Sequence, residues 1–160
     1  MKDHAGKGPI KADTEILSLL EASIRLSREM RGAFDPSLGP VSRLWNFSAG
    51  EPRLPPAPEI AQAMSKVGLD RIEIDSATGT VRLSEPGMAL DLGGIAKGYA
   101  LDRARLVIEN FGVKAALVNA GGDILAVGEK APGKPWRVGV QDPRSGNAMV
   151  AVASVKDKII

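Results

Sequence analysis

Residues 91–98 read Asp-Leu-Gly-Gly-Ile-Ala-Lys-Gly, a carboxylate followed by two glycines and a lysine. The apolar residues 88–92 predict a strand that leads into this stretch, and the residues after it repeat with helical spacing. Backbone N–H groups at a glycine turn and the positive end of a helix both attract anions. Lys97, in the first turn of the expected helix, adds a full positive charge. The stretch therefore favours a ligand with phosphate groups, in particular a diphosphate.

Asp91 qualifies this interpretation, because a carboxylate does not attract phosphate directly. A nucleotide sugar hydroxyl, or a metal ion that bridges to phosphate, would reconcile Asp91 with Lys97 in one site. The alternative is structural: the glycines make a tight turn, Asp91 caps it and Lys97 is a surface charge. Spacing alone does not separate these alternatives, because glycine-rich turns between a strand and a helix are common.

The helix after the glycines is expected to end at Gly112, since glycine is the usual residue just beyond a helix. Its apolar residues recur every three or four positions and predict one face that packs into the core. These residues are Ala96, Ala100, Ala104, Val107 and Phe111.

The N-terminal part of the chain is expected to hold one long helix and one long loop. Residues 1–11 predict a loose lead-in, after which Asp13 can cap a helix over about residues 15–31 that Gly32 ends. Residues 32–58 are rich in proline and predict an irregular loop. Loops of this length are commonly functional, so we expect it to form a wall of a ligand site.

Two further candidate sites have structural alternatives. In the loop, Asp35 stands before a proline and can accept hydrogen bonds, and Phe34 and Trp45 could pack on a flat ring. An Asp-Pro turn whose two aromatic side chains close a hydrophobic edge would explain the same residues. Residues 119–123, Asn-Ala-Gly-Gly-Asp, could bind a ligand or simply form a hairpin turn.

The order of the remaining elements predicts an α+β fold with a largely antiparallel sheet and packed helices. A short helix is expected near residues 59–67, and turn residues separate a series of strands. The expected strands are residues 71–75, 80–84, 114–119, 124–128, 136–141 and 149–155.

Composition excludes several function classes. The chain has 160 residues, a formal net charge of +2 and 4% aromatic residues, so neither a basic surface nor base-stacking platforms for nucleic acid are indicated. It has no cysteine and only one histidine, His4, which argues against thiol chemistry, a His-rich metal site and a Ser-His-Asp triad. No apolar run predicts a transmembrane segment or a signal peptide.

Four segments, in this order, resemble the ApbE family of FAD:protein FMN transferases. They are GAFDPSLGPVSRLW, LDLGGIAKGYALD, ALVNAGGD and PWRVGVQDP. The resemblance implies FAD as substrate, Mg²⁺ as cofactor, and transfer of FMN to a Thr or Ser hydroxyl of an acceptor flavoprotein. Some members of the family mainly hydrolyse FAD to FMN and AMP.

The resemblance also assigns residues. Ala33, Phe34 and Asp35 would contact the flavin nucleotide, Asp91 and Lys97 would bind FAD, and the backbone carbonyl of Gly94 would be a metal ligand. No catalytic side chain is assigned. Alanine is frequent in the family at the position of Gly94, which a carbonyl ligand tolerates, and glycine is usual at the position of Asn46.

The family pattern implies a single incomplete ApbE-like domain over residues 1–160. Residues 12–58 would supply a helix and a nucleotide-contacting loop, and residues 59–160 the hairpins and the core of strand, glycine turn and helix. The segments that carry side-chain metal ligands in the family have no match, so we expect truncation at both ends and impaired transfer. A non-catalytic flavin-binding or scaffold protein and an FAD pyrophosphatase are the alternatives. The family is usually periplasmic or lipid-anchored, whereas the missing signal peptide predicts a cytoplasmic or truncated chain.

Overall fold

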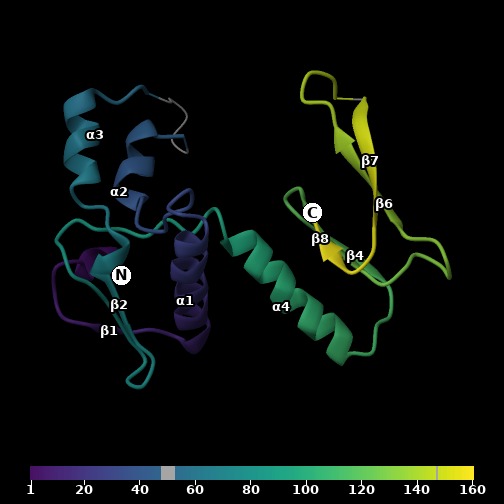
Figure 1. Cartoon of the computed structure of the whole chain (residues 1–160), viewed down its shortest axis with the longest axis horizontal. Coiled ribbons are helices and arrows are strands. Elements are labelled where there is room, and N and C mark those ends of the chain that lie inside the picture. The colour runs from purple at the N-terminus through teal and green to yellow at the C-terminus, as the bar shows by residue number, and fades with distance from the viewer. Residues whose placement is uncertain (48–52, 147) are drawn as a thin grey trace. The chain divides into compact units, whose positions relative to one another are not determined.

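The computed structural model describes residues 1–47, 53–146 and 148–160. The chain divides into two compact units, Met1–Ile95 and Ala96–Ile160, which are coloured purple to teal and green to yellow in Figure 1. Every pair of neighbouring strands in the two units is antiparallel. The α+β class with an antiparallel arrangement is thus confirmed, although the strands in the described part of the chain form three small sheets.

A three-stranded sheet organises the first unit. The predicted hairpin is present as β2 (Ile72–Asp75) and β3 (Thr80–Leu83). A short strand that was not predicted, β1 (Ile10–Lys11), pairs with the other edge of β3, giving the order β1-β3-β2. The expectation of a loose lead-in was wrong at this point, because a strand of two residues is defined by its distant partner and has no local pattern of its own.

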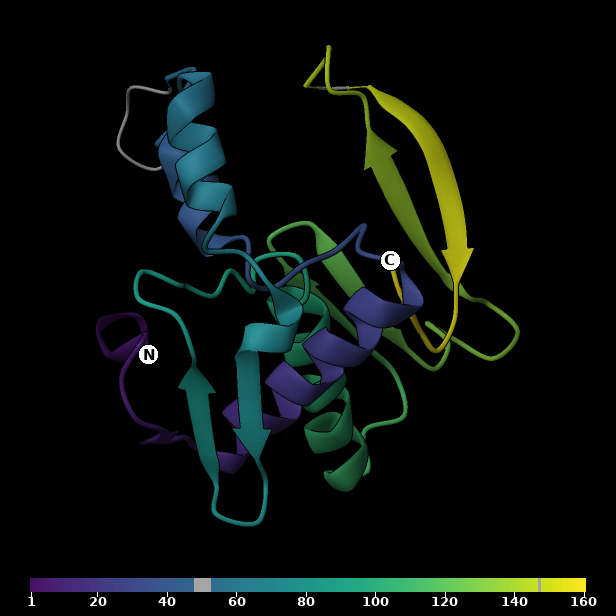
Figure 2. The same ribbon diagram turned by 60° about the vertical axis from the view of Figure 1, so that its left-hand side comes forward.

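Helix α1 (Thr14–Glu29) begins and ends close to where the sequence predicted. The side chain of Asp13 accepts a hydrogen bond of 2.9 Å from the backbone N–H of Glu15, which satisfies a donor at the helix start. Leu17 and Leu20 pack against Val81 of β3, so the helix lies along the hairpin, as Figure 2 shows.

The expected irregular loop contains two helical segments. Residues 39–45 form α2 (Gly39–Ser42) and the 3-10 helix η2 (Arg43–Trp45). Helix α3 (Ala57–Met64) begins earlier than predicted. Prolines near the first turns of α2 and α3 explain the error, because proline lacks only an N–H group that has no helical partner there. Residues 48–52 of this loop lie outside the described residues. The other 3-10 helices are η1 (Lys2–His4) and η3 (Leu69–Arg71).

The strand predicted over residues 88–92 is wrong: the segment is extended but joins no sheet among the described residues. Its neighbour is α2, a helix, which offers no ladder of hydrogen bonds. The backbone N–H of Asp91 instead donates to the carbonyl of Pro36 at 2.8 Å. Gly39 lies so close that a Cβ atom there would be 2.5 Å from the carbonyl oxygen of Ala89. The segment is therefore held by close backbone packing.

The second unit consists of one helix, a three-stranded sheet and a two-stranded ribbon. Its helix is α4 (Ala96–Asn110), and its sheet has the order β4-β5-β8, with β4 (Ala116–Ala120), β5 (Asp123–Val127) and β8 (Lys158–Ile159). The ribbon pairs β6 (Trp136–Gln141) with β7 (Met149–Val155). The hairpins were predicted, whereas β8 was not.

The face of α4 that packs on the sheet is not the predicted one. Leu101 is 2% exposed and contacts Leu125 and Val127 of β5, with Ile108 beside it. Of the face expected to be buried, Val107 is 54% and Phe111 83% exposed. Helical spacing of apolar residues occurs on both sides of this helix, so periodicity alone could not choose between them. Gly112, at φ 73°, ends the helix as predicted. None of the helices in the described part of the chain has the length and apolarity needed to cross a membrane.

Replacing Gly39 with alanine should destabilise the first unit by about 1–3 kcal/mol, because the added methyl group would press on the backbone of Ala89. Gly8→Ala is the matched control, since no atom lies within 4 Å of its Cβ position. Chemical denaturation of both variants checks the prediction. Equal stability of the two variants would contradict the packing described for Gly39.

Candidate functional site

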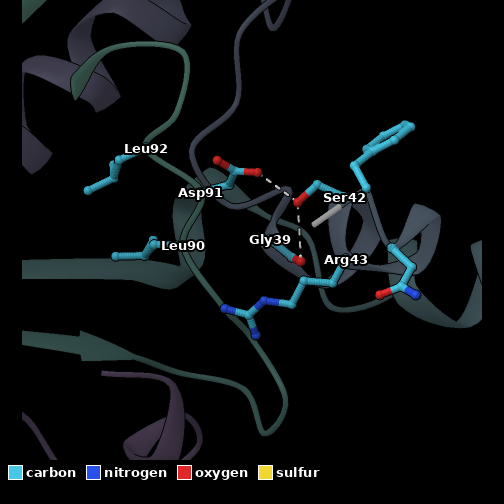
Figure 3. Close-up of a pocket in the computed structure, with 8 residues that line it drawn as sticks. Gly39, Ser42, Arg43, Leu90, Asp91 and Leu92 are labelled. Atoms are coloured by element: carbon cyan, nitrogen blue, oxygen red, sulfur yellow. Dashed lines mark hydrogen bonds between the residues drawn. The ribbon is translucent and has the colours of Figure 1, made fainter. Parts of the chain in front are cut away.

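Both carboxylate oxygens of Asp91 accept hydrogen bonds from neighbouring groups. Its Oδ2 accepts a 2.7 Å hydrogen bond from the hydroxyl of Ser42, and its Oδ1 accepts one of 3.0 Å from the backbone N–H of Gly93. Ser42 ends α2, so the bond to Asp91 ties the extended segment to that helix (Figure 3). Side chains alternate along the segment: Leu90 and Leu92 point to the opposite side from the Asp91 carboxylate and pack on the core.

These contacts lower the pKa of Asp91 below its usual value of 3.8. The hydrogen bond from Ser42 is the largest cause, followed by the N–H of Gly93, and the positive charge of Arg43 adds a smaller effect. Partial burial acts in the opposite direction. Asp91 is therefore ionised at neutral pH and can accept hydrogen bonds from a ligand.

A cavity of about 470 Å³ opens beside this carboxylate, within the first unit. Its volume is within the range of small-molecule sites. Among the described residues that line it, Asp91 is the anion and Arg43 the cation. The lining residues are Gly39, Ser42, Arg43, Asn46, Phe47, Leu90, Asp91 and Leu92.

Sequence reasoning missed Ser42 and Arg43. Both lie in the motif segment GAFDPSLGPVSRLW, but no role was assigned to either, and Ser42 and Asp91 are 49 positions apart. The only available signal was that both lie in the second candidate segment, between Asp35 and Trp45.

Phe34 and Gly94 are brought together. A Cβ atom at Gly94 would be 3.1 Å from the ring of Phe34, so the ring covers this glycine closely. Two residues that the family resemblance assigns to one site are thus neighbours.

Asp35 has a structural role. Its Oδ1 accepts hydrogen bonds from the backbone N–H and the hydroxyl of Ser37, at 2.8 and 2.7 Å. Ser37 is fully buried, and its hydroxyl oxygen accepts a 2.9 Å bond from the N–H of Gly68. Oδ1 of Asp35 therefore holds the turn at Ser37, whereas Ala33 is exposed. Asn46 adopts φ 56°, a left-handed conformation that explains why glycine suits this position.

In the second unit, Lys97 lies in the first turn of α4 and pairs with Asp123 at the start of β5. Its Nζ is 3.1 Å from Oδ1 of Asp123, and the two side chains are 52% and 38% exposed. Asn119 Oδ1 accepts a 2.9 Å bond from the N–H of Gly122, which shapes the turn before Asp123. The structure thus joins the third candidate segment to Lys97, a contact that spans 26 positions. Such an exposed pair is weak, so a phosphate group could compete with Asp123 for Lys97.

No group of three or more Asp, Glu, His or Cys side chains that could hold a metal ion occurs among residues 1–47, 53–146 and 148–160. The carbonyl of Gly94 alone does not make a magnesium site, because such sites combine carboxylates with substrate phosphates.

Comparison with known proteins places the full chain in one family. The model of the ApbE family matches residues 1–160. An FAD:protein FMN transferase of Treponema pallidum is 32% identical, with 96% of this chain and 46% of that protein covered. The crystal structure of the ApbE protein from Thermotoga maritima is 36% identical, with a TM-score of 0.88, and covers 99% of this chain and 51% of that one. The flavinyl transferase ApbE of Pseudomonas stutzeri is 30% identical with a TM-score of 0.79, over 95% of this chain and 46% of that one. The chain thus spans about half the length of the relatives it matches.

Replacing Ser42 with alanine should raise the pKa of Asp91 toward 3.8, because the largest cause of its lowering is removed. A lowered pKa stabilises the fold above the pKa of the unfolded state, and this stabilisation is lost as pH falls through the folded value. The variant should be about 1 kcal/mol less stable at pH 7, and the difference should narrow in acid. Carboxyl ¹³C NMR titration and denaturation at several pH values measure both effects, with Ser18→Ala as the control. An unchanged pKa for Asp91 would rule out the described bond.

Proposed function

The chain belongs to the ApbE family, and we propose that it forms the FAD-binding part of an FAD:protein FMN transferase. The proteins it resembles carry that activity in their names. Because the chain spans about half their length, the activity, the substrate and the acceptor are proposals for this protein.

The observation that carries the proposal is the surroundings of residues 91–98. In the first unit, an ionised Asp91 lies on the wall of a cavity of small-molecule size. Along the sequence, the chain then passes through Gly93 and Gly94 into α4 of the second unit, whose first turn bears Lys97. A helix start with a lysine suits phosphate, and a carboxylate suits hydroxyl or amide donors. FAD offers both kinds of group.

Each residue then has a distinct task. Lys97 would exchange its weak contact with Asp123 for the diphosphate, and Asp91 would accept a hydrogen bond from a donor of FAD. Phe34 would offer its ring and Ala33 its exposed surface to the flavin nucleotide. Asp35, with Oδ1 committed to Ser37, would contact the nucleotide through its other oxygen while keeping the turn in shape.

Mg²⁺ would neutralise charge as the diphosphate is split. The described residues do not fit a magnesium site by themselves, since they contain no cluster of ligating side chains. We propose the carbonyl of Gly94 as one ligand of a site that needs further groups. An ion held by one carbonyl would be poorly fixed, and this supports impaired transfer by the chain alone.

The proposed reaction joins FMN to an acceptor flavoprotein. A Thr or Ser hydroxyl oxygen of the acceptor forms a bond to the phosphorus on the FMN side of the diphosphate. The bond from that phosphorus to the bridging oxygen breaks, AMP leaves with the electron pair, and the hydroxyl proton passes to a base. Water in place of the hydroxyl would give the pyrophosphatase reaction, with FMN and AMP as products.

A second candidate is a non-catalytic flavin-binding protein of the same family. The absence of clustered metal ligands among the described residues favours it. Both candidates require FAD binding and differ in turnover. A single domain over both units, and the periplasmic or lipid-anchored location of family members, stay predictions for this chain.

FAD should bind more tightly than FMN, by about tenfold or more, because only FAD has the diphosphate for Lys97. Lys97→Ala should remove most of this preference, whereas Lys114→Ala, which removes an equal charge from an exposed position, should not. Titration of each flavin in the presence of Mg²⁺, followed by flavin fluorescence, provides the test. Equal affinity of the unaltered chain for FAD and FMN would contradict the proposal that Lys97 binds the diphosphate.

Transfer itself is tested by extending the chain with the remaining half of the Thermotoga maritima relative. Incubation with FAD, Mg²⁺ and an acceptor domain should add the mass of FMN to the acceptor. The unextended chain should be at least about a hundredfold slower, equivalent to roughly 3 kcal/mol of barrier. In the extended chain, Asp91→Ala and Lys97→Ala should lower transfer far more than thermal stability. FAD binding without transfer in the extended chain would favour the non-catalytic candidate.

A further inference from the structure

A second cavity, of about 790 Å³, lies entirely within the second unit and has no part in the proposed FAD site. It is formed by the loop between β5 and β6, the start of β6 and neighbouring residues of β4 and β7. The lining residues are Leu117, Lys130, Ala131, Gly133, Lys134, Pro135, Trp136, Arg137 and Ser154.

The charges on this cavity are all positive. Lys130, Lys134 and Arg137 line it and are exposed, and none of them forms an ion pair within the described part of the chain. The acidic residue next in sequence, Glu129, is already engaged. Its Oε1 is 3.0 Å from Nζ of Lys156, and its Oε2 accepts a 2.9 Å bond from the N–H of Gly133.

The same contacts keep Glu129 ionised and occupied. The N–H of Gly133 is the largest cause that lowers its pKa, followed by Lys156. Glu129 therefore holds the loop in shape and leaves the three lining cations without a counter-charge.

An apolar wall accompanies the cations. Leu117 and Pro135 line the cavity beside Trp136, whose indole N–H donates a 3.1 Å hydrogen bond to the carbonyl of Val127. This bond fixes the ring, so Trp136 offers a rigid, half-buried surface. Tryptophan and arginine are the residue types most enriched where binding energy concentrates at protein interfaces.

Both strands of the ribbon contribute to the cavity wall. Within the described residues β6 and β7 pair only with each other, and Figures 1 and 2 show the ribbon projecting beyond β4 and β5 of the same unit. Arg137 of β6 and Ser154 of β7 are directly opposite in the register, and both line the cavity. The cavity therefore meets the face of the ribbon, and side chains of both strands contribute to its wall.

We propose that this cavity binds an extended acidic segment of a partner polypeptide. The cations are spread over a loop and a strand, which suits carboxylates spaced along a chain better than one compact phosphate. The wall of Trp136, Pro135 and Leu117 takes apolar side chains between the acidic ones.

The identity of the partner follows only if the proposed function is right, and on that basis it is the acceptor flavoprotein. Docking an acidic segment of the acceptor here would add affinity without using the groups assigned to FAD. The peptide-binding proposal itself does not depend on transferase activity.

Fluorescence anisotropy of a labelled oligoglutamate peptide with interspersed leucines tests the cavity in the full chain. The unaltered chain should bind it, and the triple charge reversal Lys130→Glu, Lys134→Glu, Arg137→Glu should weaken binding at least about tenfold. The control is Lys7→Glu, Arg28→Glu, Lys114→Glu, which changes net charge equally at exposed positions outside the cavity and should have a much smaller effect. Circular dichroism verifies that both variants are folded.

Two further measurements test whether the peptide binds at this cavity and whether a compact polyphosphate can replace it. The indole N–H NMR signal of Trp136, assigned with Trp136→Phe, should shift when the peptide binds. Tripolyphosphate should compete only weakly. No peptide binding, equal losses in both triple variants, an unmoved indole signal, or strong competition by tripolyphosphate would each overturn the proposal.

The link to the acceptor is measured separately in the extended, active chain. The triple reversal at the cavity should raise the KM for the acceptor and leave the affinity for FAD unchanged. Peptide binding with an unaltered KM would support the cavity as a peptide site and would reject the acceptor as its partner. Absence of FMN transfer in the unaltered extended chain would count against the proposed function and leave peptide binding intact.

Discussion

The hydrogen bond between the hydroxyl of Ser42 and the carboxylate of Asp91 is the constraint on which the candidate site depends. It joins the end of α2 to the residue that precedes the glycine turn, across 49 positions of sequence. The bond between Asp91 N–H and the carbonyl of Pro36, and the close approach of Gly39 to Ala89, act in the same direction. Together they replace the strand pairing that the apolar pattern suggested. The carboxylate is consequently fixed, ionised and directed to a cavity, while Leu90 and Leu92 serve the core.

Local signals in the sequence were sufficient for much of the fold. The cap at Asp13, the stop at Gly112 and the alternation in β2 and β3 depend on residues within a few positions of one another, so pattern reasoning identified them. Helix α2 and the start of α3 were missed for a local reason, the prolines in their first turns, whereas the errors at β1 and α4 involve partners distant in sequence. β1 exists because Ile10 meets Val81, and α4 buries Leu101 because β5 lies on that side. Neither contact can be inferred from the residues next to it in sequence.

The residues of the candidate site were likewise predicted only in part from the sequence. The family resemblance assigned Asp91, Lys97, Phe34 and Gly94 to the site, and the structure shows which residues contact them. Ser42 was not singled out because its partner Asp91 is 49 positions away. Asp123 belonged to the candidate segment 119–123, but its pairing with Lys97 was not predicted. Asp35 illustrates the opposite case, in which a motif residue has a clear structural duty toward the buried Ser37. A motif therefore names positions, and their surroundings decide how much of each side chain is available to a ligand.

The contact between Phe34 and Gly94 has a consequence for how sequences of this kind can diverge. A methyl group at position 94 would lie 3.1 Å from the ring, closer than comfortable van der Waals contact, so alanine there requires the ring to move by a few tenths of an ångström. Residues in contact do not change independently in their effect on stability. Substitutions at these two positions should thus show epistasis, with the tolerance for alanine at one set by the size and placement of the ring at the other.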